Sequence, residues 1–208
     1  MYTTYIIIGV TVGITLMAFN NYDLFLRLKH WPWQERKNNE FHRWVTCGFL
    51  HANQMHLIFN MISLYFFGEL VESWFFGRFG QGGASMYVLY YLAATAAASS
   101  ATYFKYRNSP SFASVGASGA VAAVIFTSIL LRPVGDIYFI FIPIPIKSFI
   151  FGALYLWYSA YEAKQSRDNI DHTAHYYGAL FGFFFPMVIE PSLLSDFVGQ
   201  VLYWFQNL

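Results

Sequence analysis

The chain has 208 residues, of which 57% are hydrophobic, 22% aromatic and only 11% charged. Soluble domains carry about 25% charged residues, so this composition excludes an ordinary soluble surface and favours a lipid bilayer as the solvent. The net charge of +1 gives no indication of nucleic-acid binding. The single cysteine excludes an intrachain disulfide framework.

The hydropathy pattern predicts an all-α membrane protein whose whole length, 1–208, forms one domain. The six predicted transmembrane helices cover residues 4–20, 51–76, 84–104, 115–131, 148–163 and 172–189. The first lacks a positively charged leader and a cleavage site, which favours a transmembrane helix over a signal peptide. Residues 21–50 mix charges with tryptophan and apolar anchors, which is typical of a structured loop at the membrane interface.

The other segments between and after the helices are predicted from helix-breaking prolines and from polarity. Residues 132–147 form an apolar loop in which three prolines exclude a regular helix. Residues 164–171 are polar and predict a loop. The tail, residues 190–208, is apolar and aromatic and is expected to lie at the membrane interface.

Polar side chains gather at the starts of alternate predicted helices. They are His51, His56 and Asn60 on the second, Ser118 on the fourth, and His172 and His175 on the sixth. Alternate helices of a six-span bundle run in the same direction, so these residues share one face of the membrane. Because polar groups at membrane depth usually face the bundle interior, the pattern predicts a single site.

Ser118 needs a base to become a nucleophile, and His175 is the best candidate. Gly178 and Gly182 share a face with His175, and such a stripe of small residues allows helix six to approach helix four closely. No acidic side chain is evident at this depth, so the residues predict a dyad rather than a triad. Asp171 precedes helix six and is expected to cap it.

A tetrahedral intermediate also needs hydrogen-bond donors for its oxyanion. His56 and Asn60 are spaced i, i+4 and share a helix face, so both can donate into one site. The backbone N–H of Ser118 lies near a helix N-terminus, where the dipole favours negative charge. Gly116 and Gly119 flank the serine and keep this part of the helix small.

A metal site is the rival interpretation of the same residues. The four histidines His51, His56, His172 and His175 include an i, i+3 pair that could share a zinc ion. His51 and His56 are five residues apart, which puts them on different faces of a helix. No HExxH motif occurs and no carboxylate lies among them, so the dyad is favoured.

Three motifs in this order resemble those of the rhomboid family of intramembrane serine proteases. Gly116-Ala-Ser118-Gly119 resembles the GxSG around the family's nucleophile. The segment from His51 through His56 to Asn60 resembles HxxxxHxxxN, and Ala174-His175 with Gly178 and Gly182 resembles AHxxGxxxG. One GxSG is a weak signal, whereas three motifs on successive even-numbered helices are specific. The resemblance covers nearly the whole chain and predicts a rhomboid-like six-helix bundle.

The resemblance implies an intramembrane endopeptidase with Ser118 as nucleophile and His175 as base. His56, Asn60 and the Ser118 N–H would stabilise the oxyanion, with His51 and the motif glycines in support. Substrates would be single-span membrane proteins in a lipid bilayer, with no metal or other cofactor and no nucleic acid. Helix five and residues 164–171 would form the gate and the cap. The oligomeric state stays open.

The same resemblance implies a multi-pass protein of the bacterial inner membrane with both termini in the cytoplasm. The Lys and Arg residues concentrate instead in loops on the site-bearing side, which by the positive-inside rule would face the cytoplasm. The family topology is preferred here because the charge bias rests mainly on one loop.

Some positions depart from the family pattern. Arg43 follows His42 rather than a tryptophan, and Ala122 stands where many members have an aromatic residue that stacks on the histidine. Tyr176 or Tyr177 would then orient His175. Glu72 resembles a position that ties down the neighbouring loop. Two alternatives remain: a catalytically silent rhomboid-like protein that binds transmembrane clients, and a metal-dependent hydrolase.

Overall fold

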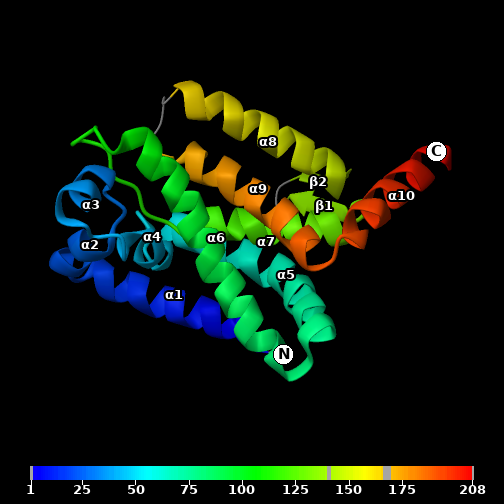
Figure 1. Cartoon of the computed structure of the whole chain (residues 1–208), viewed down its shortest axis with the longest axis horizontal. Helices are drawn as coiled ribbons and strands as arrows, with labels where there is room; N and C mark the ends of the chain where they lie inside the picture. The colour runs from blue at the N-terminus through cyan, green and yellow to red at the C-terminus, as the bar shows by residue number, and fades with distance from the viewer. Residues whose placement is uncertain (1, 140–141, 166–169, 208) are drawn as a thin grey trace.

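The computed structural model describes residues 2–139, 142–165 and 170–207, and most of them are helical (Figure 1). The longer helices are α1 Thr3–Phe19, α5 Gln54–Phe79, α6 Gly83–Tyr106, α7 Ser118–Leu131, α8 Ser148–Gln165, α9 His172–Ile189 and α10 Ser192–Gln206. The shorter ones are α2 Tyr22–Leu28, α3 Pro32–Asn38 and α4 Arg43–Thr46. The strands β1 Asp136–Phe139 and β2 Ile142–Lys147 pair in antiparallel fashion.

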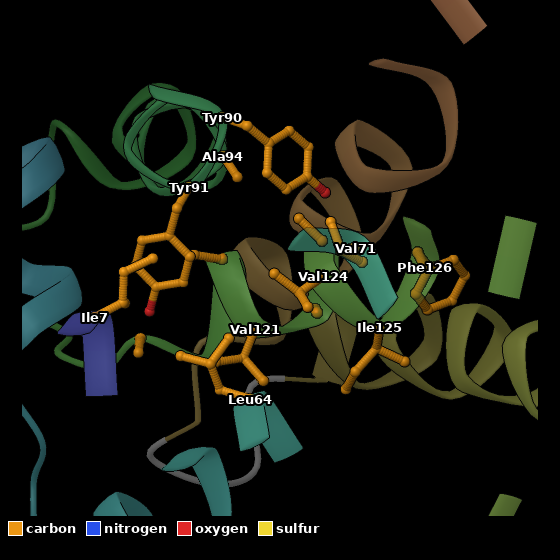
Figure 2. Close-up of a cluster of buried hydrophobic side chains, with 14 of the residues drawn as sticks. Ile7, Leu64, Val71, Tyr90, Tyr91, Ala94, Val121, Val124, Ile125 and Phe126 are labelled. Carbon is orange, nitrogen blue, oxygen red and sulfur yellow. The ribbon is translucent and has the colours of Figure 1, made fainter. Parts of the chain in front are cut away.

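Helix α7 occupies the centre of the core. It carries no charged residue and is apolar all round, and such a helix must be buried on every side. Its side chains form one buried cluster with Ile7 of α1, Leu64 and Val71 of α5, and Tyr90 and Tyr91 of α6 (Figure 2). Nearly all of its residues are buried. The central helix therefore fixes its own first residue, Ser118, relative to the helices around it.

Helices α7 and α9 approach each other through glycines. A Cβ atom on Gly178 would lie only 2.1 Å from the carbonyl oxygen of Gly119, and one on Gly182 would lie 2.0 Å from that of Ala123. Real Cβ atoms are essentially never found at less than 3.0 Å from another heavy atom. Backbone thus packs directly on backbone, which brings the start of α9 beside the start of α7.

Two buried hydroxyl groups form a chain of hydrogen bonds that joins α6, α7 and α9 near Gly182. Thr127 of α7 donates to the carbonyl of Gly182 on α9 at 2.7 Å. Its oxygen is then free to accept from Tyr90 of α6, whose hydroxyl lies 2.6 Å away. These hydrogen bonds satisfy polar groups that would be costly to bury unpaired.

The segment between α1 and α5 folds around buried charged groups. Arg43 donates to Glu40 and to the carbonyls of Leu26 and Lys29. His30 and Glu35, both almost completely buried, lie 2.6 Å apart through Nδ1 and Oε1. The predicted loop over residues 21–50 thus contains three short α-helices and a 3₁₀ helix at Cys47–Phe49. Arg43 of α4 ties this segment to the end of α2 even though a tryptophan does not precede it.

The described residues are not entirely helical. Residues 136–139 and 142–147, part of the predicted loop, form two antiparallel strands in which Asp136 pairs with Lys147 and Ile137 with Ile146. Pro143 and Pro145 exclude a helix there but are tolerated in a strand with only one neighbour. An ion pair between Lys147 and Asp136 at 2.7 Å closes the open end.

Glu72 holds the start of α1 rather than a neighbouring loop. Its carboxylate accepts from the backbone N–H groups of Thr3 and Thr4 at 2.8 and 3.0 Å, and from the Thr4 hydroxyl at 2.8 Å. An anion is favourable at a helix N-terminus, where N–H groups lack partners within the helix. The predicted anchoring role therefore acts on a different element.

The predicted interfacial tail is a helix, α10, which leaves the bundle at a sharp bend after α9 (Figure 1). Trp204 and Phe205 of α10 contact Phe149 near the start of α8, with ring centroids 5.4 and 5.9 Å away. None of the described helices has by itself the length and hydropathy of a membrane span; taken together, α9 and α10, bent by 116°, do.

Candidate active site

The backbone before α7 presents Ser118 at the helix N-terminus. Gly116 has φ +137°, a conformation open to glycine but strained for other residues, and its N–H donates to the Cys47 carbonyl at 3.1 Å. This conformation is not helical, so α7 begins at Ser118 rather than at the predicted residue 115. The hydroxyl consequently lies beside the unpaired N–H groups of the first turn.

Ser118 and His175 are in direct contact. The Oγ atom of Ser118 lies 2.7 Å from Nε2 of His175, which belongs to the first turn of α9. If the serine donates this hydrogen bond, the ring proton of a neutral His175 sits on Nδ1. The geometry is that of a hydroxyl with a base placed to accept its proton.

Two rings lie beside His175. Tyr155 of α8 has its ring centroid 6.4 Å away with the planes tilted by 34°, and His172 meets His175 edge-on at 5.7 Å. Tyr176 and Tyr177, the predicted candidates, instead contact each other at 5.4 Å. Tyr155 of α8 therefore lies beside the imidazole of His175. Because the two residues are far apart in the sequence, the motif around His175 did not reveal this contact.

His56 and Gly116 fit together on the other side of Ser118. A Cβ atom on Gly116 would lie 2.7 Å from Cε1 of His56 and 3.5 Å from Oγ of Ser118. The glycine is therefore the spacer between the imidazole and the serine. Asn53 caps α5 by accepting from the His56 N–H at 2.9 Å, which sets the position of this ring on the helix.

Asn60 lies one turn further along α5. Its side-chain amide donates one hydrogen to the His56 carbonyl at 2.9 Å. An amide nitrogen carries two hydrogens, so the second can serve another acceptor. Asn60, His56, Ser118 and His175 all line the same cavity.

His51 precedes α5 instead of belonging to it, contrary to the predicted helix start at residue 51. It is completely buried, and its Nδ1 lies 3.0 Å from the Thr15 hydroxyl, which in turn donates to the Phe49 carbonyl. Its ring meets His56 edge-on at 5.0 Å. His51 thus packs against the ring of His56 and links it to Thr15 of α1.

Asp171 caps α9, as predicted, and also has two partners that the sequence did not reveal. Its Oδ1 accepts from the Ala174 N–H and from the Thr102 hydroxyl of α6, both at 2.9 Å. Its Oδ2 accepts from the Ser114 hydroxyl at 2.9 Å. Only the cap is a local contact with a sequence signature, whereas the other two arise from tertiary packing.

The cavity has a volume of about 1020 Å³ and extends from α2 to α8. Phe25 and Lys29 line one end and Tyr155 and Glu162 the other. Burial lowers the pKa of Lys29, and the nearby Arg43 lowers it further. A volume of this size lies near the upper end of the range found for ligand-binding clefts.

The four histidines of the alternative metal site form two separate ring pairs. His51 contacts His56, and His172 contacts His175, with Ser118 bonded to the second pair. Within residues 2–139, 142–165 and 170–207, no three His, Cys, Asp or Glu side chains are grouped so that they could hold a metal ion. The described geometry therefore favours the Ser118–His175 pair.

Comparison with known proteins gives one family. The family profile described as the rhomboid domain matches residues 38–192. RHOMBOID-like protein 12, mitochondrial, from Arabidopsis thaliana is 29% identical over 69% of this chain and 45% of its own length. Rhomboid-like protein 11, chloroplastic, from the same plant is 29% identical over 76% and 54%, respectively. Rhomboid protease GlpG from Haemophilus influenzae is 28% identical over 50% of this chain and 48% of its own length.

The match covers only part of each relative, and two of their names give locations other than a bacterial membrane. The chain spans about half the length of the curated relatives it matches. Two of them carry mitochondrial and chloroplastic in their names, which does not support the narrower prediction of a bacterial inner membrane. Rhomboid family members are membrane proteins.

Proposed function

The chain belongs to the rhomboid family, and on this premise we propose that it is an intramembrane serine endopeptidase with a Ser118–His175 dyad. The observation that carries the proposal is the 2.7 Å contact between Ser118 Oγ and His175 Nε2 on the wall of the cavity. Family membership alone does not require activity, because two relatives are named only rhomboid-like.

In the proposed reaction, the Ser118 oxygen attacks the scissile carbonyl while its proton passes to His175 Nε2. The imidazolium then donates that proton to the leaving amine, which leaves an acyl-enzyme on Ser118. A water molecule in the cavity then attacks the ester carbonyl while His175 takes its proton, and the imidazolium returns that proton to the Ser118 oxygen as the ester bond breaks and the carboxylic acid product is released. The first proton transfer, from Ser118 to His175, crosses the 2.7 Å contact between the two side chains.

The oxyanion of each tetrahedral intermediate would be held at the start of α7. The Ser118 N–H belongs to the first turn, where the helix dipole favours negative charge. His56 and the second amide hydrogen of Asn60 approach from α5. Donors that are fixed before the reaction stabilise the developing charge without reorganisation.

The proposed substrates are single-span membrane proteins, cut in or near their transmembrane segments. In this proposal α1, α5, α6, α7, α8 and α9 are the six membrane spans, and residues 21–50 lie at the interface. The proposal leaves the particular membrane unassigned. It needs no cofactor, because the proposed proton transfers use side chains of the chain itself.

The test is reaction of the purified protein with a fluorophosphonate, together with cleavage of a single-span reporter protein in liposomes. Wild type should be labelled and should cut the reporter. Ser118→Ala and His175→Ala should do neither, while their thermal unfolding in detergent stays near that of wild type. Full cleavage by Ser118→Ala would refute the mechanism.

The naming of two relatives as rhomboid-like supports one second candidate, client binding without cleavage. In that case folded wild type would retain the reporter protein but would neither react with the fluorophosphonate nor cut the reporter. The liposome assay matters here, because a closed gate could block the small probe but should admit a transmembrane substrate.

A further inference from the structure

One carboxylate joins the two halves of the Ser118–His175 pair. Asp171 accepts hydrogen bonds from Thr102 of α6, from Ser114 before α7 and from the Ala174 N–H of α9. All three donors lie at 2.9 Å. One side chain therefore links α6, the segment before α7 and the first turn of α9.

The first connection leads to Ser118. Ser114 is held on three sides: its hydroxyl donates to Asp171, and its backbone N–H and C=O both pair with His30 at 2.9 and 3.0 Å. Only three residues separate Ser114 from Ser118, and one of them, Gly116, is fixed by its bond to the Cys47 carbonyl. The position of Ser114 therefore determines where the chain enters α7.

The second connection leads to His175. The carbonyl of Asp171 accepts the His175 N–H at 3.1 Å, and its side chain accepts the Ala174 N–H. These are the bonds that order the first turn of α9. Thr102, which is completely buried, gives both connections a fixed point on α6.

We propose that Asp171 is the positioning residue of the dyad: its carboxylate fixes Ser118 Oγ and His175 Nε2 at reacting distance by clamping the segments that carry them. It touches neither reacting atom, and its effect passes through Ser114 on one side and the α9 cap on the other. This inference rests on the proposed function for its consequence in catalysis, but the clamp itself can be tested without proteolysis.

The test places a thiol at the serine. In Ser118→Cys, a thiol beside His175 should form a thiolate–imidazolium pair, which lowers the thiol pKa from about 8.5 to below about 7.5. The pKa is measured from the pH dependence of iodoacetamide alkylation, with the modified peptide resolved by mass spectrometry so that Cys47 is counted separately. The clamp predicts that adding Asp171→Ala returns this pKa towards 8.5.

The isosteric variant separates hydrogen bonding from charge. Asp171→Asn keeps an oxygen for Thr102 and Ala174 and presents an N–H that the Ser114 hydroxyl can accept. It should therefore keep the low thiol pKa and, with Ser118 in place, a fluorophosphonate rate within a few-fold of wild type. Asp171→Ala should react about 10²-fold more slowly, the loss typical of a 1 Å misplacement. An Asn variant that behaves like the Ala variant would overturn the clamp.

Two single-contact variants guard against misfolding of Asp171→Ala. Ser114→Ala and Thr102→Val each remove one bond and should each raise the thiol pKa. Thr95→Val is the matched control, because this buried threonine of α6 donates only within its own helix, to the Tyr91 carbonyl. Thr102→Val with a thiol pKa equal to that of Thr95→Val would count against the clamp.

The fluorophosphonate reaction of wild type tests the proposed function, whereas the effect of Asp171→Ala tests the clamp, so either proposal can be contradicted without the other. An unreactive wild-type serine with a low, Asp171-dependent thiol pKa would contradict the proposed function and leave the clamp standing. A reactive wild-type serine whose fluorophosphonate rate, like the thiol pKa of Ser118→Cys, is unaffected by Asp171→Ala would contradict the clamp and leave the proposed function standing.

Discussion

Replacement of Gly178 by alanine tests the contact that brings α9 to α7. The new Cβ atom would lie 2.1 Å from the Gly119 carbonyl oxygen, whereas ordinary van der Waals contact begins at 3.4 Å. The helices must therefore separate by about 1.3 Å at this point. The obstacle is backbone on both sides, so no side-chain rotation can relieve it.

The displacement should reach the proposed dyad nearly undiminished. Gly178 lies one turn after His175 on the same helix, and Gly119 is the residue after Ser118. A misplacement of about 1 Å can cost roughly 10²-fold in rate. Overpacking of this kind also lowers the free energy of unfolding by about 1–3 kcal/mol.

The assay is the fluorophosphonate reaction rate beside thermal unfolding in the same detergent. Gly77→Ala is the matched control, because it adds the same methyl group within α5 where nothing lies within 4 Å of the new Cβ atom. The control should keep the wild-type rate and gain about 0.5–1 kcal/mol of helix stability. If Gly178→Ala reacts and unfolds like Gly77→Ala, the close packing of α7 on α9 does not govern the dyad.

Three further substitutions probe neighbouring features. Asn60→Ala should slow reporter cleavage by about 10²–10³-fold with little change in substrate binding, as expected for one oxyanion donor, and an unchanged cleavage rate would remove Asn60 from that role. Gly116→Ala should prevent fluorophosphonate labelling, because the backbone there has φ +137° and the methyl group would meet His56 at 2.7 Å; normal labelling would contradict the spacer role. Glu72→Ala should lower the midpoint of thermal unfolding, since it leaves two N–H groups of α1 unpaired at roughly 1–3 kcal/mol each; a wild-type midpoint would argue against the anchor.

The sequence predicted the long helices because their signals are local. The predicted helix over residues 172–189 coincides with α9, which an aspartate caps at its start. The predicted helix over 84–104 differs from α6 by one residue at its start and two at its end. Apolar length and end signals suffice for such elements.

The sequence did not predict features that depend on distant partners. The α7 start at Ser118 depends on the Gly116 backbone and its bond to Cys47, neither of which hydropathy reveals. The place of Tyr155 beside His175 and the bonds from Thr102 and Ser114 to Asp171 also join segments far apart in the chain. Residues 166–169 of the predicted cap lie outside the described structure.

The backbone pairing of His30 with Ser114 has a consequence for how the domain is built during synthesis. A chain is made from its N-terminus, so the segment containing His30 exists well before Ser114 leaves the ribosome. It can serve as a template on which the turn before α7 settles. His175 arrives later still, on α9. The serine and the histidine therefore cannot meet until α9 has been made, and any shorter nascent chain lacks the pair.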